Sequence, residues 1–400
     1  MRYALEVCLY RPSFRFVTAT TSIVALIVAV CSAASLDPKP IGELIDIGGR
    51  KLHIHCIGSG KPAVVVENGG AAFSFDWELV QREVEKFTRI CTYDRAGYAW
   101  SDAGPEFDTF EQAAQDLHLL LEKAGIPGPY VLVGHSLGGM LVRYYQSKYP
   151  ADVAGMVLVD SSHEESLQHV GPRVVRIPEL TAKQFQLLID EGKVDRPKNP
   201  EPDVVPSNIF PPYDKLPAQF QDLHLWALRR VLPLIKNWGL NLPLDLSRLH
   251  QLRITRPHPV GNIPLAVLTA LQFDVVQAPG MTVEQAREDH LRLQNDLAKL
   301  STNSKQIMVP GSGHEIYLYK PNVVVSCIAA VVSSAKNHSP LTPCSDGDRA
   351  IVGSRESVPL PECACALQPT DSGLGTVPWR TLQADDLRCY CAVARYVMAV

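Results

Sequence analysis

Three residues that lie far apart in the chain have the side-chain types of a nucleophile, an acid and a base. Ser136 stands in the middle of Gly134–Gly138, Asp160 ends a run of apolar residues, and His314 follows much later. A serine hydroxyl becomes nucleophilic when an imidazole accepts its proton, and a carboxylate can hold that imidazole in the correct tautomer. These types, in this order along the chain, predict acyl transfer through a covalent acyl-serine.

The residues around Ser136 predict the elements that would present it. Residues 130–133 are apolar and β-branched, as in a buried strand, and a helical pattern follows from Leu141. Glycines at 134 and 138 permit a sharp turn with the serine at its apex. The first amides of the helix would then point at the space beside the hydroxyl and stabilise an oxyanion. Gly70, in the glycine-rich loop after the strand at 63–67, is the expected second amide donor.

Strands alternate with helices along most of the chain, which predicts an α/β fold with a mostly parallel sheet and helices on both faces. The predicted strands cover residues 42–47, 51–57, 63–67, 88–93, 130–133, 155–160, 263–269 and 306–309. Functional sites in such sheets lie at the carboxyl ends of the strands. Ser136, Asp160 and His314 all stand just beyond a predicted strand end, so we expect them to meet at one edge.

The pattern divides the chain into five parts. Residues 41–160 and 263–335 form the two halves of the α/β core, and 161–262, rich in proline and helical pieces, forms a helical cap inserted between them. Residues 1–36 have arginines, then an apolar run, then small residues, which is typical of a signal peptide or an uncleaved membrane anchor. Residues 336–400 form a tail with five of the 10 cysteines. Either interpretation of residues 1–36 predicts an exported or membrane-anchored protein, in which cysteines can form disulfides.

Four motifs together resemble the α/β-hydrolase superfamily, nearest to the branch with prolyl-iminopeptidase-like and small-ester hydrolases. They are Val64–Gly70, Tyr93–Gly97, Gly134–Gly139 and Gly313–His314, and the resemblance covers about residues 41–334. It implies Ser136 as nucleophile, His314 as base and the amides of Leu137 and Gly70 as oxyanion hole. It also implies esters, thioesters, lactones or amides as substrates, with no metal or organic cofactor.

The chain departs from the family pattern at two places. The first oxyanion loop usually begins His-Gly, whereas this chain has Asn68-Gly69. The acid usually follows the next-to-last strand, where Asp274 comes about one residue late. Some relatives instead place it after the strand that follows the serine helix, where Asp160 stands. We favour Asp160, with Asp274 as the alternative.

The sequence is compatible with three functions. The first is a serine hydrolase of carboxylic esters, with cap aromatic residues lining an apolar pocket or packing the cap: Phe185, Phe210, Phe220, Trp226 and Trp238. The second is an N-terminal-residue peptidase, which would bind a free amine through acidic cap residues: Glu164, Glu165, Asp190 and Glu191. The third is a non-catalytic binding protein that kept the fold.

The composition and the other polar residues point to no further chemistry. A net charge of −4 gives no reason to expect a nucleic-acid partner. His53 and His55 share one face of a strand, which we interpret as a polar edge strand rather than a metal site. Asp94 and Arg95 are interpreted as an ion pair that fixes the loop after the strand at 88–93. The expected partner is a small-molecule ester or amide.

Overall fold

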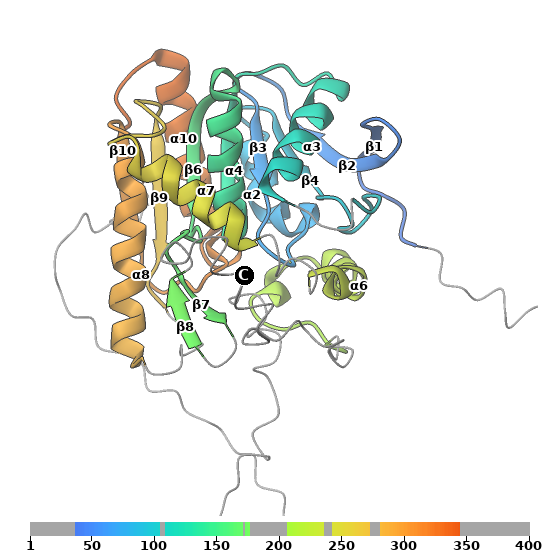
Figure 1. The fold of residues 1–400 in the computed structure, drawn as a ribbon. Coiled ribbons are helices and arrows are strands. Elements are labelled where there is room, and N and C mark those ends of the chain that lie inside the picture. The colour runs from blue at the N-terminus through green and yellow to red at the C-terminus, as the bar shows by residue number, and fades with distance from the viewer. Residues whose placement is uncertain are drawn as a thin grey trace, which may run out of the picture. The chain divides into compact units, whose positions relative to one another are not determined.

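An eight-stranded sheet is the centre of the described chain (Figure 1). The computed structural model describes residues 37–104, 109–170, 173–176, 206–235, 242–272 and 281–344. The strands are β1 (Glu43–Asp46), β2 (Lys51–Ile57), β3 (Val64–Glu67), β4 (Ile90–Tyr93), β5 (Tyr130–His135), β6 (Val153–Val159), β9 (Leu265–Ala270) and β10 (Ser304–Val309). Their order is β1-β2-β4-β3-β5-β6-β9-β10, antiparallel from β1 to β4 and parallel beyond. The predicted fold class is confirmed.

Helices cover both faces of this sheet (Figure 1). They are α2 (Glu78–Val84), α3 (Phe110–Lys123), α4 (Leu137–Lys148), α8 (Val283–Leu297), α9 (Ile316–Tyr319) and α10 (Pro321–Asn337). Val64 and Val66 pack in one apolar cluster with α2 and α10, whereas Val65 packs in a second with α3 and α4. Successive strand residues point to opposite faces, and both faces are covered. The central strands are therefore apolar throughout rather than alternating with polar residues.

The segment 161–262 contains more than helices. Its described elements include a hairpin of β7 (Leu167–Val170) and β8 (Arg173–Arg176), and the helices α6 (Ala218–Ile235) and α7 (Leu242–Ile254). The sequence pattern did not predict the hairpin or α7. Helix α7 lies against α4 (Figure 1) and buries Leu246 and Leu249 in the second cluster, so it extends the helical layer of the core. Helix α6 contacts the short 3-10 turn Ser74–Trp77 through Phe220, whose ring lies 6.5 Å from Phe75.

Two disulfides tie the described core. Cys56 and Cys91 are register partners on β2 and β4, and Cys327 in α10 pairs with Cys344 just beyond that helix. In the part of the chain that the structure describes, no helix is long and apolar enough to cross a membrane. Several residues considered in the sequence analysis lie outside the described ranges. They are residues 1–36, the cysteines after 344, Asp274 and the cap residues Phe185, Asp190, Glu191 and Trp238.

Two interpretations of polar residues are wrong. Strand β2 is not an edge strand, because β1 covers it, and His53 is fully buried, with Nδ1 2.7 Å from Asp94 Oδ2 and Nε2 2.6 Å from the Ile41 carbonyl. Asp94 and Arg95 do not pair with each other, because adjacent side chains at a strand end point to opposite sides. Asp94 binds His53, and Arg95 binds Glu67.

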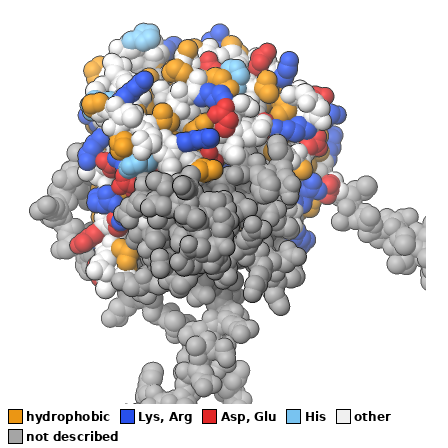
Figure 2. Space-filling model, in the orientation of Figure 1, with side chains coloured by type: hydrophobic (Ala, Val, Ile, Leu, Met, Phe, Trp, Pro, Cys, Tyr) orange, Lys and Arg blue, Asp and Glu red, His pale blue; other side chains and the backbone are white. Residues whose placement is uncertain are grey.

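The described surface carries charges of both signs. Figure 2 shows lysine, arginine, aspartate and glutamate side chains interspersed over the described part of one face, among scattered apolar ones. Exposed apolar side chains there are a normal feature of soluble domains. This mixture of charges agrees with the composition of the whole chain, which has 38 basic and 42 acidic residues.

Candidate active site

Ser136 occupies a strained turn between β5 and α4. Its φ of 52° and ψ of −123° place a non-glycine residue in a sparsely populated region, at a cost of about 1–3 kcal/mol. Three backbone hydrogen bonds hold it there. Its N–H donates to the Val159 carbonyl at 3.3 Å, and its carbonyl accepts from Gly139 at 3.0 Å and from Ser162 at 2.9 Å. The turn that the sequence predicts at 134–138 is therefore present, with the serine at its apex.

Close packing explains why glycines flank the serine. A Cβ on Gly138 would lie 2.2 Å from the Glu67 carbonyl oxygen, and one on Gly134 would lie 2.6 Å from the Gly138 carbonyl oxygen. Both neighbours are backbone atoms, which cannot move aside like the end of a flexible side chain. The turn thus lets α4 approach the end of β3 closely, and it brings the first helical amide, that of Leu137, beside the serine. That amide has no acceptor within its own helix.

Asp160 and His314 meet at the same edge of the sheet. Asp160 directly follows β6, His314 follows β10, and the Nδ1 of His314 lies 2.7 Å from Asp160 Oδ2. Burial alone would raise the pKa of Asp160, but the charges and hydrogen bonds of His290 and His314 hold it well below its usual range. Burial likewise works to lower the pKa of His314, yet its hydrogen bond to Asp160 and that carboxylate's charge raise it above its usual value.

His135, which precedes Ser136 in the chain, contacts His314 and so links the serine turn to that histidine. The rings of His135 and His314 lie 4.6 Å apart, and His135 Nε2 lies 3.1 Å from the His314 carbonyl oxygen. Among the described residues, Ser136 Oγ contacts Ser162 Oγ at 3.4 Å and has no hydrogen bond to the His314 ring. Catalytic hydrogen bonds are often long without substrate and tighten in the complex. Burial and the charge of His314 push the pKa of His135 well below its usual value.

The loop after β3 lies directly against this turn. A Cβ on Gly69 would fall 3.2 Å from Ser136 Cβ, whereas one on Gly70 would meet no described atom within 4 Å. Arg95 fixes the loop, because its guanidinium donates to the carbonyls of Asn68 at 2.5 Å and Gly69 at 2.6 Å. The Asn68 side chain is buried and donates to the Tyr93 carbonyl at 2.8 Å. Asparagine therefore anchors the loop at the position where the family has histidine.

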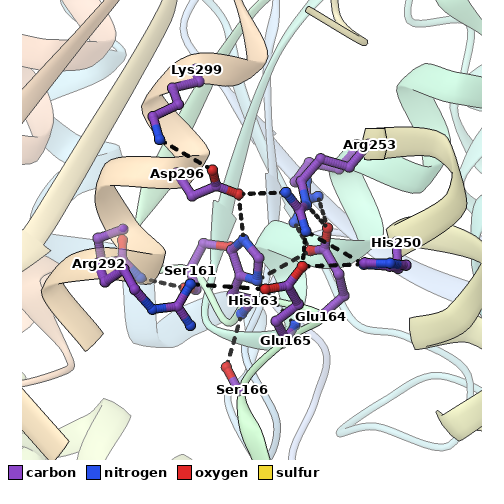
Figure 3. A network of polar contacts seen from close by, with 12 residues as sticks. Ser161, His163, Glu164, Glu165, Ser166, His250, Arg253, Arg292, Asp296 and Lys299 are labelled. Atoms are coloured by element: carbon purple, nitrogen blue, oxygen red, sulfur yellow. Dashed lines mark hydrogen bonds and ion pairs between the residues drawn. The ribbon is translucent and has the colours of Figure 1, made fainter. Parts of the chain in front are cut away.

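A network of polar contacts involves the segment that follows Asp160 (Figure 3). Glu164 is fully buried and accepts from Arg143 at 2.8 Å and Arg253 at 2.7 Å. Arg253 of α7 also binds Asp296 of α8 at 2.7 Å and pairs with Glu165. The network links the segment after Asp160 to α4, α7 and α8. Glu164 and Glu165 are thus engaged by arginines, and this removes two of the four acidic residues considered for binding a substrate amine.

The cap aromatic residues that are described take part in packing. Trp226 lies 5.4 Å from Trp100, Phe210 lies 5.3 Å from Tyr213, and Phe220 joins the core cluster beside Phe75. The contacts of Trp226 and Phe220 join α6 to the core, whereas the contact of Phe210 lies within the chain before α6. The interpretation that these rings pack the cap therefore applies to the three residues that can be placed.

Sequence reasoning missed two residues at the site. His290 of α8 puts Nε2 3.1 Å from Asp160 Oδ1, and the Ser162 hydroxyl contacts the Ser136 hydroxyl. No local motif marks His290, which is separated from Asp160 by 130 residues. Among the described residues, no group of three or more histidine, cysteine or acidic side chains is arranged to hold a metal.

Comparison with known proteins agrees with the observed fold. A family profile described as the alpha/beta hydrolase fold matches residues 62–187. A thermophilic esterase from Thermogutta terrifontis superposes with a TM-score of 0.50 at 20% identity, covering 73% of this chain and 98% of that one. The chain thus has the α/β-hydrolase fold, and residues 62–187 resemble the family that the profile describes.

Two curated relatives share only part of their length with the chain. A probable transporter of Hormonema carpetanum is 37% identical over 157 residues, which are 37% of this chain and 21% of the relative. A (lyso)-N-acylphosphatidylethanolamine lipase of Bos taurus is 32% identical over 127 residues, 30% of this chain and 36% of the relative. The chain thus spans less than half the length of each of these relatives.

Proposed function

We infer that the protein is a serine hydrolase that cleaves carboxylic esters through an acyl-serine intermediate. The observation that carries the proposal is the contact of 2.7 Å between His314 and Asp160, at the sheet edge where Ser136 stands on its turn. A buried carboxylate bound to an imidazole, beside a serine on a strained turn, is the arrangement that activates a hydroxyl for acyl transfer. A relative that is named as a lipase supports an ester rather than another acyl donor.

The proposed first half-reaction acylates the serine. His314 accepts the Ser136 proton while Oγ attacks the ester carbonyl, and the carbonyl π electrons move to its oxygen. The amides of Leu137 and Gly70 donate hydrogen bonds to that oxyanion. When the tetrahedral species collapses, the bond to the alcohol oxygen breaks, and the leaving alkoxide takes the proton from His314.

The second half-reaction returns the enzyme to its starting state. A water gives its proton to His314 and attacks the acyl carbon, a carboxylic acid leaves, and Ser136 regains its proton. Asp160 stays ionised throughout, in keeping with its lowered pKa, and stabilises the imidazolium that forms twice in the cycle. No step needs a metal or an organic cofactor.

Labelling with a fluorophosphonate tests this proposal directly. The probe should modify the wild type and leave Ser136→Ala unlabelled, and short-chain p-nitrophenyl esters should be hydrolysed by the wild type alone. Ser147→Ala is the matched control, because it removes an exposed hydroxyl on the same helix and should keep the label. A wild type that neither labels nor hydrolyses would refute the proposal and favour a binding protein with this fold.

We also propose that the chain is exported or membrane-anchored through residues 1–36. The two disulfides in the described core support this, because such bonds persist in oxidising compartments. Protein isolated from cells in the presence of an alkylating reagent should show Cys56, Cys91, Cys327 and Cys344 unmodified until it is reduced. Alkylation of all four before reduction would contradict the proposal.

A further inference from the structure

The carboxylate of Asp160 has more partners than a triad requires. Oδ2 accepts from His314 at 2.7 Å, whereas Oδ1 accepts from the Ala270 amide at 2.9 Å and from the Nε2–H of His290 at 3.1 Å. Two imidazoles therefore bind one carboxylate, one on each oxygen. The mechanism above uses His314 and leaves His290 unexplained.

Helix α8 places His290 beside Asp160. It begins with a capping box, in which Thr282 and Gln285 satisfy each other's backbone amides. One turn after His290, on the same face of the helix, Gln294 donates to the Ser161 carbonyl at 2.7 Å. A further half-turn on, Asp296 binds His163 at 3.3 Å (Figure 3). Three residues of the helix, at 290, 294 and 296, thus contact the segment 160–163.

The acid needs such support because its backbone is strained. Asp160 has a φ of 41°, in the left-handed region that residues with a side chain rarely adopt. Such conformations persist only where the surroundings fix them by several contacts. The Asp160 amide donates to the Leu268 carbonyl at 2.8 Å, and the three bonds to its side chain fix the rest.

We propose that His290 is a positioning residue that acts through Asp160. By occupying Oδ1, it holds the carboxylate plane so that Oδ2 stays aimed at His314 Nδ1. Without it, Oδ1 keeps only the hydrogen bond from the Ala270 amide, so the carboxylate resists rotation about its Cβ–Cγ bond less strongly and holds the His314 tautomer less firmly. This role rests on the proposed function for its effect on turnover, but the geometry it predicts at His314 is independent of the substrate.

The kinetic test compares His290→Leu with His290→Gln. Leucine removes the donor, whereas the glutamine amide can place a donor near the position of the imidazole Nε2. We expect leucine to lower kcat about tenfold to a hundredfold with KM nearly unchanged, the loss expected for one hydrogen bond to a charged group. Glutamine should restore most of the rate, and Glu288→Gln, an exposed change on the same helix, should match the wild type.

Proton NMR gives a second measurement that does not depend on turnover. The His314 Nδ1–H bound to Asp160 should give a downfield resonance, identified by its loss in His314→Gln. This resonance should move or broaden in His290→Leu and return in His290→Gln. If His290→Leu does not fold, His290→Asn, which is too short to reach Oδ1, replaces it in both measurements.

The outcomes separate this proposal from the proposed function. An unchanged resonance and an unchanged kcat in His290→Leu would overturn the positioning role. A wild type without esterase activity or probe labelling would overturn the proposed function, and the NMR comparison alone would then decide whether His290 positions Asp160.

Discussion

Replacing Asp160 by asparagine should remove nearly all turnover, for a reason that follows from its contacts. Asp160 Oδ1 accepts two hydrogen bonds, from Ala270 and His290, so the amide oxygen of asparagine should take that place. The NH₂ group would then replace Oδ2, 2.7 Å from His314 Nδ1. Nδ1 would have to accept rather than donate, and the ring proton would move to Nε2. A ring in that tautomer cannot accept the Ser136 proton.

The expected size of the effect is large. Holding the wrong tautomer of the catalytic histidine costs a serine hydrolase roughly 10⁴-fold in kcat, which corresponds to about 5.4 kcal/mol of transition-state stabilisation at about 1.36 kcal/mol per tenfold. Hydrolysis of p-nitrophenyl butyrate by Asp160→Asn, measured with the rate of fluorophosphonate labelling, gives this number. Thermal unfolding of the same variant checks that it is folded.

Asp274→Asn is the matched control, because Asp274 is the alternative acid predicted from the sequence. It should keep a rate close to that of the wild type. The assignment would be refuted if Asp160→Asn stayed within about tenfold of the wild type while Asp274→Asn lost most of its activity. Loss of activity in neither variant would refute the use of a carboxylate to orient His314.

Two further predictions concern the base and the loop of the oxyanion hole. Asp160 raises the pKa of His314, and only neutral His314 can accept a proton, so the acid limb of kcat/KM should lie above pH ~6.5; a limb below that pH would contradict the assignment. Arg95→Met leaves the Glu67 carboxylate buried without its partner, so it should lower the free energy of unfolding in urea by about 3–5 kcal/mol. Adding Glu67→Gln to Arg95→Met should recover part of the lost free energy of unfolding. A loss below about 1 kcal/mol for Arg95→Met alone would show that the pair of Arg95 and Glu67 does not hold the loop.

The sheet and the serine turn were predictable because their signals are local. Strands that are covered on both faces read as uninterrupted apolar runs, and the turn needs glycine at 134 and 138 for steric reasons that hold in any context. Helix α7 was missed because its leucines stand at mixed spacings. Leu246 and Leu249 are buried against α4, whereas Leu244 and Leu252 are 42% and 38% exposed, so the sequence shows no single apolar stripe.

The partners of polar residues were less predictable, because they depend on which strands become neighbours. Asp94 was assigned to Arg95, next to it in the chain, but it binds His53 on β2, which is paired with β4. The same limit applies to His290. Its helix follows β9, and nothing in residues 283–297 alone shows that one face will meet the end of β6.

The order of the strands shows how Asp160, which follows β6, reaches His314 beyond β10. Strand β9 lies between β6 and β10, which are therefore two strand spacings apart, about 10 Å. The Asp160 side chain must extend over the end of β9 to reach His314. Asp160 has a left-handed backbone, and its Oδ1 accepts from the amide of Ala270, the last residue of β9. The end of β9 therefore supplies a backbone donor to the acid instead of carrying the acid itself. This accounts for a chain that keeps its serine, its histidine and its fold while residues 268–273, where the family usually has the acid, contain no carboxylate.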